Sequence, residues 1–214
     1  MSLEKKIKSN YTNLFNKSDW KIFKLNADKY FESAALLKKK DFGKEKIILE
    51  SLKNNDIRLQ LRNKRKRLFI GLGSELLIKS FYLKSGFYIN SVIEDKKNGK
   101  GKNAFKFSEI CISDVQSEKT MNFNNLIQGL NEVDRKINNK KRGKVEINIS
   151  NALNIAKVFR NKEAHVSTKW HKFDSNDYDE IEKGVKNMYK LWFNEDLQFQ
   201  ISFEISEKGE FKIE

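Results

Sequence analysis

Hydrophobic residues recur every three or four positions through most of this chain, which is the spacing of an amphipathic helix. Six stretches show it, and the pattern predicts helices over 27–40, 45–52, 56–86, 121–137, 148–167 and 175–195. Proline is absent from the sequence, so no residue type that breaks helices interrupts these stretches. The chain is therefore expected to be mostly helical.

Several helix ends and inward faces can be predicted from individual residues. Asn26 is typical of an N-cap for the first helix, and Gly86 is typical of the end of the long helix over 56–86. The inward positions of that long helix are expected to be Ile57, Leu61, Leu68, Leu72 and Leu76. Those of the last two helices are expected to be Leu153, Ala156 (or Ile155), Phe159, Tyr178, Ile181, Val185, Met188 (or Tyr189) and Trp192.

Two stretches have the character of strands. Residues 87–95 follow the long helix as a strand, and residues 197–213 alternate between apolar and polar positions around a turn, as a hairpin does. The basic, glycine-containing stretch 95–106 and the stretch NNKKRGK at 138–144 are expected to be exposed loops. The resulting fold class is all-α, one domain over 1–214 with a small carboxy-terminal β hairpin.

The charge balance changes the picture from fold to partner. The chain has 43 basic and 29 acidic residues and a net charge of +14, which favours a polyanionic partner such as RNA. Arg58, Arg62 and Arg65 recur at helical spacing as a basic stripe, which makes them candidate RNA-binding residues. Two bland causes of this charge remain open. Lysine enrichment also follows from an AT-rich coding sequence, and a short charged stripe is often only a solvated surface.

Other chemistries find little support. Cys111 is the one cysteine and the chain has 2 histidines, so we expect no transition-metal site and no cofactor. The stretch IGLGSELLIKS lacks the glycine that should precede Lys79 in a phosphate-binding loop, and Glu75 and Lys79 are expected to form an ordinary surface pair. The charged amino terminus and the lack of any long apolar run lead us to expect a cytoplasmic protein that does not enter a membrane.

The stretch RNKEAH contains the most specific chemical signal. Arg160 and His165 are five residues apart at the end of a predicted helix, and Asn161 adds a neutral donor. Arginine binds phosphate oxygens with a planar fork of donors, and histidine titrates near neutral pH and can serve as acid or base. These are the groups that RNA cleavage by the 2′-hydroxyl requires, and no metal is needed. Arg160, Asn161 and His165 are therefore candidate catalytic residues.

This motif resembles that of the HEPN superfamily, the domains named for higher eukaryotes and prokaryotes nucleotide-binding. That superfamily carries an Arg-polar-x3-His motif, matched here by Arg160, Asn161 and His165. A looser likeness is the Glu-x3-Lys pattern from Glu75 to Lys79 on the long helix, which many HEPN proteins have on an early core helix. The two likenesses cover 56–86 and 148–167.

The resemblance implies an up-and-down helical bundle, a homodimer with a composite site at its twofold axis, and metal-independent ribonuclease activity in toxins or antiviral defence. It also implies a possible antitoxin or nucleotidyltransferase partner, since some HEPN proteins act beside one. The alternative is a non-catalytic module of the same fold that binds RNA or a partner protein. A third hypothesis is a helical scaffold with no role in nucleic-acid binding.

Overall fold

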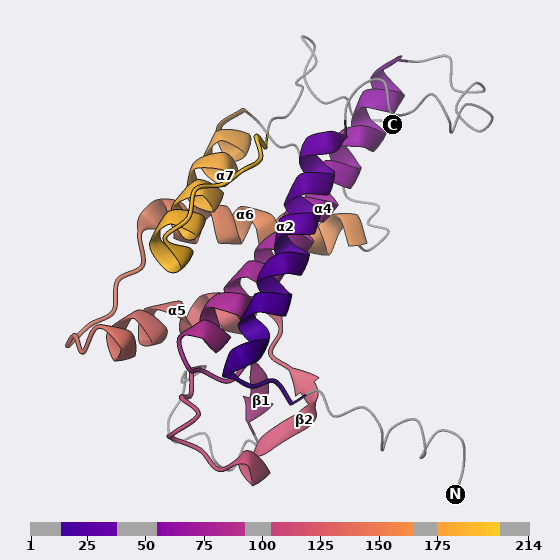
Figure 1. Cartoon of the computed structure of the whole chain (residues 1–214). Coiled ribbons are helices and arrows are strands. Elements are labelled where there is room, and N and C mark those ends of the chain that lie inside the picture. Colours follow the sequence, from indigo (N-terminus) through magenta and orange to yellow (C-terminus); the bar gives the residue numbers. More distant parts are fainter. Residues whose placement is uncertain (1–13, 38–54, 93–103, 165–174, 202–214) are drawn as a thin grey trace, which may run out of the picture. The chain divides into compact units, whose positions relative to one another are not determined.

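The computed structural model of the protein describes residues 14–37, 55–92, 104–164 and 175–201 (Figure 1). These residues are mostly helical and include a small antiparallel sheet, which confirms the predicted predominance of helix. The helices are η1 (Lys17–Asp19), α2 (Trp20–Leu36), α4 (Asn55–Lys84), η4 (Ile112–Asp114), α5 (Phe123–Ile137), α6 (Ile147–Ala164), α7 (Ser175–Met188) and a π-helical turn, η5 (Tyr189–Phe193). Among the described helices, none is long and apolar enough to cross a membrane.

The described residues fall into two compact units. Unit 1 contains 14–24, 77–92 and 104–145, and unit 2 contains 25–37, 55–76, 146–164 and 175–201. Helices α2 and α4 each contribute residues to both units. The prediction of one domain over 1–214 stays a prediction.

In unit 1, α4 ends where the sequence predicts. Gly86 has a φ of 81°, in the left-handed region that glycine adopts readily. The backbone N–H of Gly86 donates to the carbonyl of Leu83, and that of Phe87 donates to the carbonyl of Tyr82. The rings of Tyr82 and Phe87 meet at a centroid distance of 6.2 Å. These contacts form a Schellman motif with its usual apolar pair, and they confirm the predicted stop at Gly86.

A two-stranded antiparallel sheet follows. Strand β1 (Asn90–Val92) pairs with β2 (Val115–Thr120), with Asn90 opposite Thr120 and Val92 opposite Val115. The strand predicted within 87–95 is thus confirmed for its described middle part.

Helix α5 completes the core of unit 1. It begins after Asn122, whose side chain accepts a hydrogen bond from the backbone of Asn125, and it buries Phe123, Leu126 and Leu130. The phenol of Tyr82 donates to the carbonyl of Leu126 at 2.6 Å, so this hydrogen bond ties α4 to α5.

Lys136 of α5 ties the helix to the segment that precedes β2. Its ammonium donates to the carbonyl of Ala104 at 2.9 Å and to the carboxylate of Glu109. Burial acts to raise the pKa of Glu109, but hydrogen bonds from Lys136 and from the backbone N–H of Lys106 outweigh it and hold the pKa below its usual value.

In unit 2, α6 and α7 pack with their backbones close together. A Cβ at Gly184 would lie 2.1 Å from Cβ of Ala152 and 2.5 Å from the carbonyl oxygen of Asn148, so only glycine allows this approach. The buried positions predicted for both helices are confirmed, with Ala156 buried and Ile155 only partly so.

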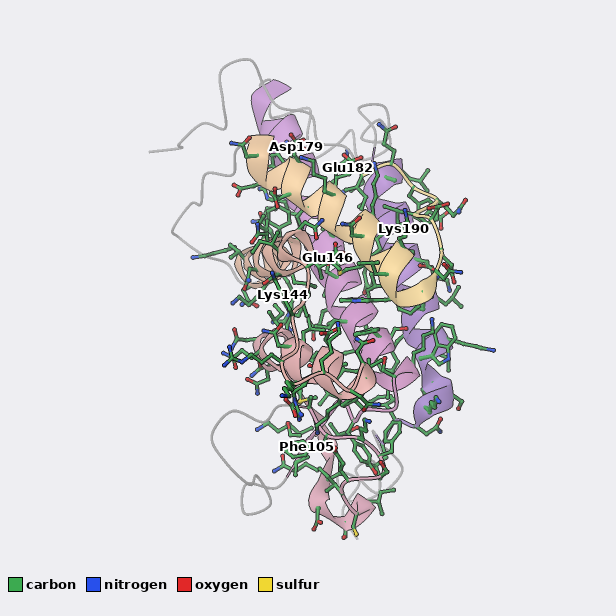
Figure 2. All side chains as sticks on the ribbon, turned by 90° about the vertical axis from the view of Figure 1, so that its left-hand side faces the viewer. Phe105, Lys144, Glu146, Asp179, Glu182 and Lys190 are labelled. Atoms are coloured by element: carbon green, nitrogen blue, oxygen red, sulfur yellow. The ribbon has the colours of Figure 1, made fainter. Side chains whose placement is uncertain are left out.

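Charges are distributed unequally along α7. Figure 2 shows Asp179 and Glu182 on its amino-terminal half and Lys190 beyond its last turn. This order suits the helix dipole, which favours negative charge near the first turn and positive charge near the last.

Two predictions about helix geometry are wrong. Helix α2 begins at Trp20 and not after Asn26, because a capping box between Asn16 and Asp19 starts the preceding turn. In α4, Leu68, Leu72 and Leu76 are only partly buried. The buried apolar residues of α4 are Ile70, Leu77, Ile78, Tyr82 and Leu83.

Other predictions fall outside the described residues. The helix expected over 45–52 lies wholly outside them, as does most of the basic loop over 95–106. The carboxy-terminal hairpin over 197–213 lies mostly outside, and its described residues, 197–201, form no strand.

Candidate functional site

The candidate site in unit 2 is built where α4 and α6 cross at Gly71. A Cβ at Gly71 would lie 2.7 Å from both Cβ and the backbone nitrogen of Arg160, and 2.8 Å from its Cα. These distances are far shorter than an ordinary van der Waals contact, and the atoms met are backbone atoms or are fixed to the backbone. Glycine at 71 therefore lets the first residue of the RNKEAH motif lie directly on α4.

Glu75, one turn after Gly71 on α4, makes an ion pair with Arg160. Nε of Arg160 is buried and lies 3.1 Å from Oε2 of Glu75, in an approach that is not an aligned hydrogen bond. The Glu75 side chain is 10% exposed, whereas that of Arg160 is 35% exposed. The expected surface pair of Glu75 with Lys79 is thus wrong about the surface, because Glu75 is buried and its charge faces Arg160.

Asn161 holds the same guanidinium from a second direction. Nη1 of Arg160 donates to Oδ1 of Asn161 at 3.1 Å, and the Asn161 side chain is exposed. Glu75 and Asn161 thus fix the orientation of the Arg160 side chain while about a third of it stays open to solvent. Such an arginine can accept an oxyanion without first losing much side-chain freedom.

A second ion pair joins the same two helices on the other side of the crossing. Nε of Arg67, one turn before Gly71, lies 2.6 Å from Oε1 of Glu163, and both side chains are less than a tenth exposed. Nη1 of Arg67 also donates to the phenol of Tyr178 on α7, at 3.1 Å. The last turn of α6 is therefore held to α4 at both Arg160 and Glu163, and to α7 through Arg67.

Sequence reasoning missed the structural roles of Gly71, Arg67 and Glu163. A glycine inside a helical pattern indicates a close approach of another element, which Gly71 makes. Glu163 gave a second signal, because an acidic residue in the last turn of a helix opposes the helix dipole and needs a compensating cation. Arg67 supplies that cation.

The remaining predicted site residues are placed less fully. His165 follows the last described residue of α6, Ala164, and lies outside the described residues. Arg58 and Arg62 belong to the helical backbone of α4, but their side chains are not among those that the structure describes. Arg65 is exposed on α4 in unit 2.

The buried phenols near the cores are not alternative proton-transfer groups. Burial raises the pKa of Tyr82, and burial together with a hydrogen bond to Asp28 raises the pKa of Tyr189. Both phenols therefore stay neutral and serve as hydrogen-bond donors within their own units. In the described ranges, no group of three or more His, Cys, Asp and Glu residues is placed to hold a metal ion.

No family model, no curated protein and no solved structure matches this chain. The function is therefore inferred from the crossing of α4 and α6 itself. This crossing offers one oriented, partly exposed guanidinium and a neutral amide, five and four residues before a histidine.

Proposed function

We propose that the protein is a metal-independent endoribonuclease of HEPN type, acting in the cytoplasm in toxin or antiviral function. The observation that carries the proposal is the state of Arg160, which is oriented by Glu75 and Asn161 and still 35% exposed. An arginine with a purely structural role in a helix crossing is usually buried along its whole length. The partial exposure leaves donors for a phosphate five residues before His165.

The proposed roles follow the chemistry of the groups. Arg160 holds the scissile phosphate, Asn161 orients Arg160, and His165 transfers protons. The 2′-oxygen loses its proton to a base and attacks phosphorus, and the 5′-oxygen leaves with a proton from an acid. The products are a 2′,3′-cyclic phosphate and a 5′-hydroxyl end, so no metal and no external reagent enters the reaction.

One histidine per chain is too few for a reaction that uses both an acid and a base. A twofold homodimer that brings together two copies of the last turn of α6 would supply two histidines and two arginines. We propose this shared site as the HEPN-like arrangement. A mixed dimer with one His165→Ala chain should then lose far more than half of the activity.

The test is cleavage of structured RNA by the purified full chain in EDTA. We expect cyclic phosphate ends from the wild type, and loss of cleavage with binding retained in His165→Ala. Lys190→Ala removes an exposed cation outside the motif and serves as the control. Cleavage that requires a divalent metal, or that survives in His165→Ala, would refute the proposal.

A non-catalytic module that binds RNA or a partner protein is the second candidate. The observation that favours it is the ion pair with Glu75, which already neutralises part of the Arg160 charge. Arg65, exposed on α4, would then contribute to binding together with Arg58 and Arg62. Under this function His165→Ala changes neither binding nor the RNA, and an antitoxin or nucleotidyltransferase would be the partner to seek in pull-down experiments.

A further inference from the structure

The turn between α5 and the start of α6, residues 138–144, displays a dense group of positive charges in unit 1. Its sequence is NNKKRGK, and it is called the basic turn below. All of its residues except Gly143 are exposed. The four cations are Lys140, Lys141, Arg142 and Lys144. Lys144 is visible in Figure 2 on the stretch that follows α5.

The basic turn is built by side chains of α5. Oδ2 of Asp134 accepts the backbone N–H of Lys144 at 2.9 Å, and Oδ1 of Asp134 accepts the side-chain amide of Asn138 at 2.8 Å. Oδ1 of Asn131 accepts the backbone N–H of Val145 at 3.1 Å. Two polar side chains of α5 are thus committed to the beginning and the end of the turn.

The backbone of the turn has little freedom as well. Asn139 adopts a φ of 49°, a left-handed conformation that asparagine tolerates better than most residues. A Cβ at Gly143 would lie 1.6 Å from the carbonyl oxygen of Asn131, so no other residue fits there without moving α5. Because the turn is fixed, a ligand that binds its cations does not have to order the backbone.

The cations of the turn are mostly not neutralised by the protein. Nζ of Lys140 lies 3.6 Å from Oδ2 of Asp134, but that carboxylate is already engaged with backbone and amide donors. Within the described part of the chain, Lys141, Arg142 and Lys144 make no ion pair. A fixed turn that displays several cations this close together repels itself and favours an anionic partner with closely spaced charges.

The chemistry of the turn fits a nucleic-acid backbone best. Neighbouring Cα atoms are about 3.8 Å apart, and phosphates recur about every 3.4 Å along one strand of a duplex. Exposed Asn138 and Asn139 add neutral donors, which often contact phosphates and sugars. A membrane surface would call for apolar side chains among the cations, and 138–144 contains none.

We propose that the basic turn is an RNA-binding surface that contacts the phosphate backbone without reading sequence. It is separate in the chain from the Arg160 motif and from the Arg58, Arg62 and Arg65 stripe. The choice of RNA over other nucleic acids rests on the proposed ribonuclease function. The turn would hold the substrate strand outside the site of cleavage and so act on binding more than on turnover.

The experiment compares two triple variants in the full chain carrying His165→Ala, which prevents cleavage during the measurement. The turn variant is Lys140→Gln, Lys141→Gln and Arg142→Gln. The matched control is Lys183→Gln, Lys186→Gln and Lys190→Gln, three exposed lysines of α7 and η5. Each variant lowers the net charge from +14 to +11, since 14 − 3 = 11. Binding of a fluorescent RNA is followed by anisotropy across a range of salt concentrations.

We expect the turn variant to weaken RNA binding about a hundredfold at about 0.1 M salt, because three phosphate contacts are lost at a slope of about 0.7 each. Its salt slope should fall by about two units, while the control variant should differ little from the parent protein. Equal losses in both variants would show a general charge effect and overturn the proposal. So would a parent protein that does not bind RNA.

Two further arms separate the remaining outcomes. Ile137, just before the turn, is 42% exposed, so vesicles containing phosphatidylserine are tested in place of RNA. Turn-dependent binding to vesicles without binding to RNA would overturn the proposal in favour of a lipid surface. In the chain with His165 intact, RNA binding that depends on the turn but is not accompanied by cleavage would support the RNA surface and refute the ribonuclease function.

Discussion

Gly71→Ala tests whether the backbone of α6 lies directly on α4 at the candidate site. The added Cβ would lie 2.7 Å from two atoms of Arg160, against about 3.4 Å for the shortest ordinary contact. The two helices must separate by about 0.7 Å, and overpacking of this kind typically costs about 1–3 kcal/mol. Alanine also gains about 1 kcal/mol over glycine in a helix, so the measured loss understates the clash.

Gly73→Ala is the matched control, because it adds the same Cβ to the same helix two residues later. There the added atom would meet the ring of Phe31 at 3.1 Å, and a ring can shift more easily than a backbone. Both variants gain the same helix propensity, so the difference between them isolates the contact with Arg160. We expect Gly71→Ala to be about 1–3 kcal/mol less stable than Gly73→Ala.

The assay is urea denaturation followed by the fluorescence of tryptophan, with Trp192 in the core of unit 2 as a reporter. RNA cleavage is measured on the same samples. A separation of about 0.7 Å would lengthen the contact between Arg160 and Glu75 from 3.1 to about 3.8 Å, and misplacement on this scale can reduce catalysis about a hundredfold. If Gly71→Ala proves as stable as Gly73→Ala, the close crossing of α4 and α6 is refuted.

Three further variants test neighbouring contacts. Glu163→Gln should cost about 3 kcal/mol in urea denaturation, because Arg67 then loses the carboxylate of a buried ion pair, and a loss below about 1 kcal/mol would argue against that burial. Tyr178→Phe should cost about 1 kcal/mol in the same assay by removing the hydrogen bond from Arg67, and unchanged stability would refute that bond. Since the folded-state pKa of Glu109 is lowered, its ion pair with Lys136 stabilises the protein above pH 4.5, and this contribution is lost as the pH falls through the folded pKa. The stability difference between wild type and Glu109→Gln should therefore shrink below pH 4.5 in thermal unfolding, and a difference that grows would contradict the sign.

The fold was predictable wherever one helix face decides burial. In α6 and α7, positions such as Leu153, Phe159 and Ile181 lie on a single apolar face, and all are buried as the periodicity predicts. Helix α4 behaves differently, since it buries Ile70 and Leu77 but also Arg67, Ser74 and Glu75. A helix contacted on several sides has no single apolar face, so the line of leucines drawn from periodicity pointed to the wrong side.

The candidate site shows the same division between local and distant information. Arg160 and Asn161 lie next to each other in sequence, so their contact could be anticipated, and it is present at 3.1 Å. Glu75 and Gly71 are distant in sequence, and their roles depend on where α4 meets α6. The periodicity of either helix alone contains no information on that meeting point. What the sequence did contain were residues that fit their own helix poorly, a glycine in mid-helix and an acid in a last turn.

These poorly fitting residues fix the two ends of the crossing, and they do so with opposite charge order. At one end α6 supplies the cation, Arg160, and α4 the anion, Glu75; at the other α6 supplies the anion, Glu163, and α4 the cation, Arg67. A shift of α6 along α4 by one turn would bring like charges together, because Arg160 would approach Arg67 or Glu163 would approach Glu75. Repulsion between like charges thus opposes alternative registers while each correct pair stabilises the observed one. The pairs differ in exposure, because the Arg67–Glu163 pair is buried and the Arg160 side chain is partly open. The closed pair can set the position of the last turn of α6, which leaves the open arginine available to bind an anion.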